Sequence, residues 1–71
     1  MHNIDSIQDL AELIKDKRKD QGLSQEDLAG IANTGARFIV DLEKAKPTCQ
    51  VEKVFDVLNA LGIKLGVDDG N

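Results

Sequence analysis

One segment carries the clearest local pattern in the chain: residues 23–44 read LSQEDLAGIANTGARFIVDLEK. Ser24, followed three places later by Asp27, approximates a capping box, which starts a helix. Asn33 opens the sequence Asn-Thr-Gly and can adopt the positive φ that a tight corner between helices requires. Helical spacing of apolar residues resumes over about 36–44. The segment therefore predicts two short helices joined by a tight turn.

The flanking sequence predicts two further helices. Apolar residues at helical spacing indicate a helix over about 7–21, which Ser6 caps and Gly22 ends in a left-handed conformation. Pro47 prevents continuation of the helix before it, and a fourth helix follows, ended by Gly62. Helices therefore account for most of the chain.

Residues 63–67 have a different period. They alternate apolar and other residues, as a β-strand does, with Ile63, Leu65 and Val67 on one face. A lone strand leaves its backbone groups unpaired, so we expect it to pair with the same strand of a second copy across a twofold axis. The alternative is a frayed tail that merely covers the core.

These elements predict an all-α fold in one domain over residues 1–71. A chain of 71 residues is near the lower limit for a single hydrophobic core, which favours a homodimer. The expected architecture is a compact four- to five-helix bundle, with a helix-turn-helix at 24–44 and a short C-terminal strand that pairs across the dimer.

Composition excludes several classes of function. Cys49 is the single cysteine and His2 the single histidine, so no internal disulfide and no thiolate metal cluster are expected. No catalytic constellation is evident, so we expect neither an enzyme nor a cofactor. The absence of a long apolar run and of a signal-peptide pattern predicts a cytoplasmic protein without membrane contact. With two Phe and no Trp or Tyr, single-strand nucleic-acid binding by base stacking is disfavoured.

The predicted helix over 36–44 has two different faces. Residues three and four apart share a face, which turns Ile39, Leu42 and Glu43 toward the core. The opposite face begins with small residues, so that the backbone can approach base edges in a groove of double-stranded DNA. This outward stripe consists of Ala36, Arg37, Val40, Asp41 and Lys44.

Two charged residues fall on apolar faces. Arg18 lies one turn beyond Ile14, and Glu43 lies one turn beyond Ile39, so both charges point inward. We therefore expect a partly buried ion pair that locks the first predicted helix to the third. This structural role is preferred to DNA contact for both residues.

Residues 18–67 resemble the Xre and phage-repressor type of helix-turn-helix protein. Within that type, HipB-type antitoxins are similar to this chain in three segments, RFIVDLEKAKPT at 37–48, VEKV at 51–54 and LNALGI at 58–63. The resemblance implies a homodimer that binds a palindromic operator in its own promoter and a HipA-like kinase toxin encoded beside it. When bound to DNA, such a protein is associated with the nucleoid.

The resemblance also implies which residues meet DNA. Groove-facing positions fall on the outward stripe, Gln25 contacts a phosphate or supports the recognition helix, and Lys46 lies in a loop that touches backbone phosphates. The whole expected DNA-contacting set is Ser24, Gln25, Gly35, Ala36, Arg37, Val40, Asp41, Lys44 and Lys46.

Three positions depart from the family pattern. Asn33 replaces the usual turn glycine, which is tolerable because Asn adopts left-handed conformations. Gly35 stands where Ser or Thr normally caps the recognition helix, so backbone N–H groups must replace the hydroxyl contact. Ala45 replaces a common glycine, which predicts an extended or strained helix end.

Three of these contact residues have an alternative role. Arg37 is suited to bidentate contact with guanine, although an exposed arginine on an acidic protein also aids solubility. Asp41 either accepts a hydrogen bond from a cytosine amino group or orients Arg37, and the second role is preferred. Gln25 is equally suited to direct contact and to support.

The net charge of −4 conflicts with DNA binding, because a DNA-binding protein is expected to be basic. Residues 36–48 contain three cations and two anions, and pairing of Glu43 with Arg18 leaves this segment net positive by two. The acidic excess lies elsewhere, available to a basic partner. We therefore expect few phosphate contacts per subunit and a shallow dependence of affinity on salt.

Other functions remain open at this point. The protein could be a repressor without a toxin partner, or a protein-only adaptor that has kept the fold and lost DNA binding. An acidic carrier protein is disfavoured, because the Asp5-Ser6-Ile7 triplet precedes the first predicted helix instead of following it.

Overall fold

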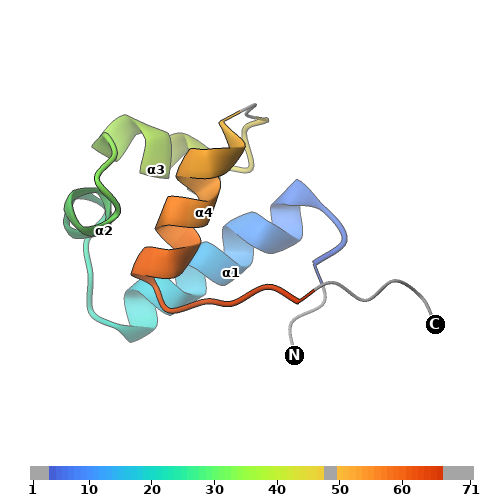
Figure 1. The fold of residues 1–71 in the computed structure, drawn as a ribbon, viewed down its shortest axis with the longest axis horizontal. Helices are drawn as coiled ribbons and strands as arrows, with labels where there is room; N and C mark the ends of the chain where they lie inside the picture. The colour runs from blue at the N-terminus through green and yellow to red at the C-terminus, as the bar shows by residue number, and fades with distance from the viewer. Residues whose placement is uncertain (1–3, 48–49, 67–71) are drawn as a thin grey trace.

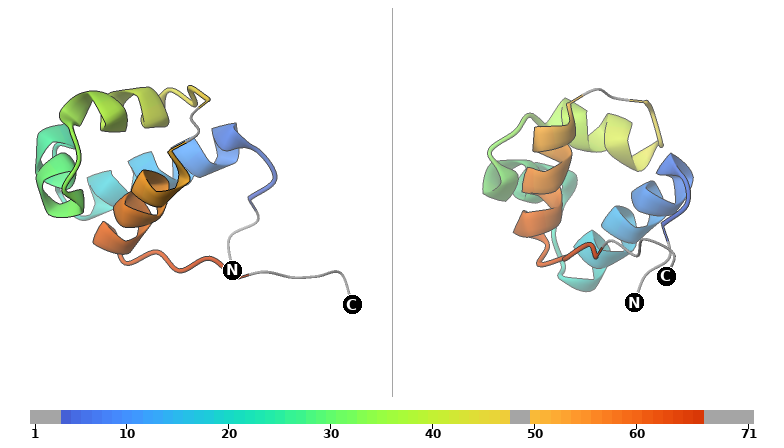
Figure 2. Two further views of the ribbon diagram at one scale, coloured as in Figure 1. Left: turned by 45° about the horizontal axis from the view of Figure 1, so that its top comes forward. Right: turned by 45° about the vertical axis from the view of Figure 1, so that its right-hand side comes forward.

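The computed structural model describes residues 4–47 and 50–66, and within these ranges it contains four α-helices and no β-strand. The helices are α1 (Ile7–Asp20), α2 (Gln25–Ala32), α3 (Ala36–Glu43) and α4 (Val51–Ala60). Figures 1 and 2 show α2 and α3 meeting at a corner, with α1 and α4 closing the other sides of one interior. The all-α prediction is confirmed, with four helices.

The first two helices begin at the caps that the sequence predicts. The Ser6 hydroxyl accepts a hydrogen bond from the Asp9 N–H at the start of α1. At the start of α2, Asp27 N–H donates to Ser24 Oγ over 2.9 Å, and Ser24 N–H donates to Asp27 Oδ2 over 3.0 Å. This reciprocal pair is a complete capping box.

All four helices end in the same way, with a residue of positive φ followed by a backbone hydrogen bond back to the last turn. The four residues are Gly22 (φ 70°), Asn33 (φ 58°), Ala45 (φ 60°) and Gly62 (φ 74°). After each of them, the next N–H donates to a carbonyl five residues earlier, as in a Schellman motif. Three of the four are glycine or asparagine, which adopt this conformation readily, whereas Ala45 is strained in it.

The core lies between the inward faces of all four helices. Its largest completely buried side chains are Ile14, Leu28, Ile39, Leu42, Val57 and Leu58. Burying one such side chain contributes about 1.5–3 kcal/mol relative to leaving it in water. Because Ile39 and Leu42 supply the α3 share of this core, the orientation of α3 is set by packing.

The predicted C-terminal strand is not supported by the residues that the structure describes. Ile63 lies in the core with 6% exposure, and its N–H donates to the Leu58 carbonyl over 2.9 Å. It is the apolar residue that follows the left-handed Gly62 in the cap of α4, a position that often packs on the preceding turn. Residues 64–66 continue without strand structure, and Val67 lies outside the described residues.

Candidate nucleic-acid interface

The turn between α2 and α3 sets the direction of α3. The Thr34 N–H donates to the Ala29 carbonyl over 2.9 Å, which closes the corner after the left-handed Asn33. Gly35 then caps α3 without a side-chain hydrogen bond. The first N–H groups of α3 therefore receive no hydroxyl from their cap residue, as the sequence predicts.

The outward stripe of α3 is exposed unevenly. Arg37 stands out with 83% of its side chain exposed, and Lys44 is also exposed. Val40 is half-buried, and Ala36 packs partly against the core instead of lying wholly outside. Fewer side chains on this face of α3 are therefore available to a ligand than the helical spacing predicts. Arg37 is the most prominent cation among them.

Arg18 and Glu43 form the inward ion pair that their spacing predicts. Arg18 Nε lies 2.7 Å from Glu43 Oε2, and Arg18 Nη2 lies 3.0 Å from Glu43 Oε1. The side chains are only 10% and 4% exposed, and Nη1 donates to the Leu23 carbonyl over 2.8 Å. The hydrogen bond to Glu43 raises the pKa of Arg18 above its ordinary value. Burial acts in the opposite direction, and the attraction between the two charges raises the pKa further.

Gln25 joins this ion pair to the start of α2. Its Nε2 donates to Glu43 Oε1 over 3.2 Å. The Gln25 side chain therefore helps to hold α3 in place, which is one of the two roles that the sequence allows. Ser24 is also engaged, because its hydroxyl caps α2 and its hydrogen bonds hold the pKa of Asp27 below the ordinary value of 3.8. The backbone N–H of Ser24 makes the larger contribution to the lowering of this pKa.

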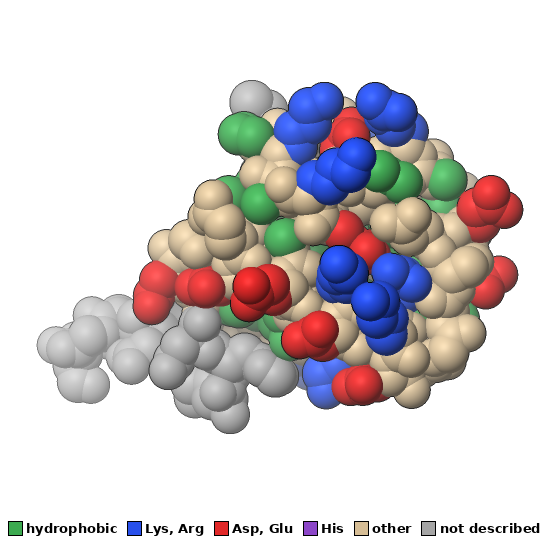
Figure 3. Space-filling model, turned by 180° about the vertical axis from the view of Figure 1, so that it is seen from behind, with side chains coloured by type: hydrophobic (Ala, Val, Ile, Leu, Met, Phe, Trp, Pro, Cys, Tyr) green, Lys and Arg blue, Asp and Glu red, His purple; other side chains and the backbone are tan. Residues whose placement is uncertain are grey.

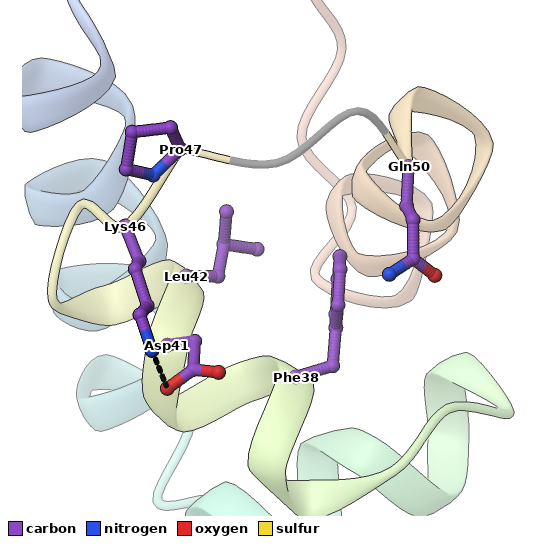
Figure 4. A pocket seen from close by; sticks show the side chains of 6 residues that line it. All are labelled: Phe38, Asp41, Leu42, Lys46, Pro47 and Gln50. Atoms are coloured by element: carbon purple, nitrogen blue, oxygen red, sulfur yellow. Dashed lines mark ion pairs between the residues drawn. The ribbon is translucent and has the colours of Figure 1, made fainter.

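The loop after α3 returns to the outward face. Lys46 N–H donates to the Asp41 carbonyl over 3.0 Å, and Lys46 Nζ lies 4.0 Å from Asp41 Oδ1. The same Oδ1 lies 3.4 Å from Arg37 Nε. Figure 4 shows the Lys46 side chain folded back toward Asp41 at the rim of a cavity of about 230 Å³. One carboxylate therefore pairs with two exposed cations.

Sequence reasoning missed one contact near this surface. Lys53 Nζ lies 5.8 Å from the centroid of the Phe38 ring, within the range of a cation–π interaction. Lys53 belongs to α4 and Phe38 to α3, so no periodicity within one helix could have indicated the pair. It adds a cation beside the first turn of α3.

The charges are grouped by region. On the face drawn in Figure 3, Lys and Arg side chains gather in two groups with acidic side chains between and beside them, and further acidic side chains lie toward the rim. A shallow pocket on α1 is lined by Asp9, Glu12, Asp16 and Asp20, together with Ile4, Leu13 and Lys17. Part of the excess negative charge therefore lies on α1, on a surface separate from the outward stripe of α3.

Two further properties bear on function. Within residues 4–47 and 50–66, no group of three or more His, Cys, Asp or Glu side chains is arranged to hold a metal ion. No helix in the same part of the chain is both long enough and apolar enough to cross a membrane.

A family model described as helix-turn-helix matches residues 14–67, which is most of the chain. The protein belongs to the helix-turn-helix family. The uncharacterized HTH-type transcriptional regulator y4mF of Sinorhizobium fredii is 49% identical to it over 59 residues, covering 83% of this chain and 78% of the relative. This helix-turn-helix protein therefore has a relative named as a transcriptional regulator.

Solved structures share the whole fold. A chain of a HipA-HipB-O2-O3 complex matches with a TM-score of 0.88, and one of a HipB-O4 20mer complex matches with 0.87. A structure called MDT Protein also matches with 0.88. Each is 22% identical and covers 100% of both chains, so these matches show the common fold. The resemblance to HipB is thus present in the arrangement of the helices.

Proposed function

We propose that this protein binds double-stranded DNA through the outward face of α3 and represses its own operon as the antitoxin of a toxin-antitoxin pair. The observation that carries the proposal is Arg37, 83% exposed in the first turn of the second helix of the helix-turn-helix. A guanidinium in this position can donate two hydrogen bonds to guanine O6 and N7 in the major groove. The contacts to phosphate would come from Lys44 and Lys46.

The arrangement of the remaining expected contacts supports this assignment. Ala36 and Gly35 keep the front of α3 small, and Val40 offers an apolar contact to a thymine methyl. Gln25 is tied to Glu43 and acts by holding α3 in place. The family relative named as a transcriptional regulator and the matching HipB-DNA complexes agree with DNA as the ligand.

A gel shift with DNA from upstream of the protein's own gene tests the proposal. The wild type should shift this duplex, and Arg37→Ala should weaken binding about tenfold to a hundredfold. Lys64→Ala is the matched control, because it removes one exposed cation from the C-terminal segment, which Figure 1 places far from α3. Absence of a shift by the wild type, with or without its partner, would overturn DNA binding and favour the protein-only adaptor.

We infer that the DNA-binding form is a homodimer joined through an apolar groove. The groove has a volume of about 300 Å³ and is lined by Ile7, Leu10, Leu42, Val51, Val54, Phe55, Leu58 and Leu65. Val51 and Phe55 are 58% and 51% exposed, an unfavourable arrangement for an isolated chain. A second copy fits best, because twofold symmetry presents two α3 helices to a palindromic operator.

Sedimentation of point variants tests the homodimer. Phe55→Asp should give a monomer, because it places a charge in the groove. Ile31→Asp should remain dimeric, since Ile31 is equally apolar and 58% exposed but lies on α2, outside the groove. A monomeric wild type, or equal effects of the two substitutions, would contradict this interface.

The proposed protein partner is a HipA-like kinase toxin. Support comes from the match to a chain of a HipA-HipB complex and from the acidic surface of α1, which suits a basic partner. Co-expression with the product of the neighbouring gene should give one complex on size exclusion. Failure to form it, with the gel shift intact, would favour a repressor without a toxin. In either case we propose a protein without catalytic activity and without a cofactor. We also propose that it is cytoplasmic and that it joins the nucleoid when it is bound to DNA.

A further inference from the structure

Asp41 occupies an unusual place on a surface proposed to meet DNA. It is an acid on the outward face of α3, and 30% of its side chain is exposed. DNA phosphates repel a carboxylate, so an acid at this position lowers affinity for DNA of any sequence unless it performs another task. The contacts of Asp41 indicate what that task is.

The first contact is with Arg37, one turn earlier on α3. Asp41 Oδ1 lies 3.4 Å from Arg37 Nε, the nitrogen nearest to the backbone. A guanidinium held at Nε keeps its two terminal nitrogens directed outward, and these form the planar fork that matches the guanine edge. The ion pair therefore restricts Arg37 without occupying the part of it that reads a base.

The second contact is with Lys46 in the following loop. Lys46 Nζ lies 4.0 Å from the same Oδ1, and the Asp41 carbonyl also accepts the Lys46 N–H over 3.0 Å. Figure 4 shows the lysine lying back along the loop toward Asp41. Asp41 therefore holds a base-reading candidate and a phosphate-binding candidate through a single oxygen.

The third observation is the charge balance. Glu43 is neutralised inside the fold by Arg18, so Asp41 is the acid that remains on the outward side of α3. It reduces the attraction of Arg37, Lys44 and Lys46 for phosphates. Its energetic effect is unfavourable on every duplex, whereas the gain from an oriented Arg37 is available only where guanine lies in reach.

We propose that Asp41 sets the sequence discrimination of this protein: it positions Arg37 for a guanine and lowers binding to DNA that has no guanine at that place in the site. This inference rests on the proposed DNA binding. It assigns to Asp41 a positioning role that acts through Arg37, with Lys46 held as the accompanying phosphate contact.

The test compares affinity for a duplex from upstream of the gene with affinity for a scrambled duplex of the same composition, by fluorescence anisotropy. Asp41→Asn keeps the size of the side chain and removes its charge. Binding to the scrambled duplex should tighten, and the slope of log K against log salt should steepen by about 1. The ratio of the two affinities should fall by about tenfold. Asp16→Asn, an exposed acid on α1, should leave the ratio unchanged.

A second variant separates positioning from simple charge removal. In the background of Arg37→Ala, Asp41→Asn should still tighten binding to scrambled DNA but should no longer change the affinity ratio. An unchanged ratio for Asp41→Asn alone would overturn the inference, as would equal weakening on both duplexes, which indicates a purely structural role. Equal affinity of the wild type for the two duplexes would reject the discrimination assigned to Asp41, whereas failure of the wild type to bind either duplex would reject the proposed DNA binding, and this inference with it.

Discussion

Two arginine–carboxylate pairs lie on opposite faces of α3, and they differ in almost every property except their chemistry. Arg18 and Glu43 are 2.7 Å apart, buried, and bonded further to Leu23 and Gln25. Arg37 and Asp41 are 3.4 Å apart and far more exposed. A buried pair has no solvent to replace a lost partner, whereas an exposed pair does. Burial therefore assigns the first pair to stability and leaves the second available for binding.

The largest expected effect tests this difference directly. Glu43→Ala should lower the free energy of unfolding by about 3–5 kcal/mol, because it leaves the Arg18 charge buried without a partner. Asp41→Ala, the matched truncation on the outward face, should change it by no more than about 0.5 kcal/mol. Urea unfolding at one protein concentration measures both. Similar losses for the two variants would show that burial does not distinguish the pairs.

A double substitution sharpens the same point. Arg18→Met combined with Glu43→Leu removes both charges and keeps most of the volume, so no buried charge is left unpaired. We expect the double variant to be about 2–3 kcal/mol more stable than Arg18→Met alone. Thermal unfolding of the two variants measures the difference. If the double variant is no more stable than the single one, Glu43 has a role beyond its pairing with Arg18.

The loop that carries the outward lysine offers a smaller effect. Ala45 has φ 60°, a conformation that costs an alanine about 1–2 kcal/mol and a glycine much less. Ala45→Gly should therefore stabilise the protein by about 0.5–1 kcal/mol after the greater chain entropy of glycine is included. Lys44→Gly is the control, since Lys44 has φ −89° and should gain nothing. Destabilisation by Ala45→Gly would mean that the alanine methyl makes a favourable contact.

The smallest expected effect is the pH dependence of the α2 cap. Hydrogen bonds from Ser24 lower the pKa of Asp27 in the folded protein, so its ionised form is favoured by folding. The resulting stability is present above the ordinary pKa of 3.8 and is lost as the pH falls through the lowered value. The Tm difference between wild type and Asp27→Asn should accordingly shrink on acidification from pH about 5 to pH about 2. A constant difference over that range would contradict this linkage.

Local signals predicted the helices well. Ser6, Ser24, Asn33 and the two terminating glycines act within one turn of their own position, so their effects can be read from neighbouring residues. The strand over 63–67 was predicted from an equally local pattern, and the described part of it, residues 63–66, has no strand structure. Ile63 follows the cap of α4, where an apolar residue packs on the preceding helix. In the sequence, the same apolar residue looks like the first position of an alternating strand pattern.

The sequence by itself determined where α1 and α2 begin, the residues that end α1, α2 and α4, and the inward direction of Arg18 and Glu43, because 3.6-residue periodicity and hydrogen bonds within one turn are local. Only the tertiary structure decided that Ile63 enters the core, that Gln25 hydrogen-bonds to Glu43, and that Lys46 turns back onto the Asp41 carboxylate. These contacts depend on how the chain leaves α4, on how it turns after Ala45 and on how α2 meets α3. Such geometry follows from packing the helices around one core, and no spacing within a single helix encodes it.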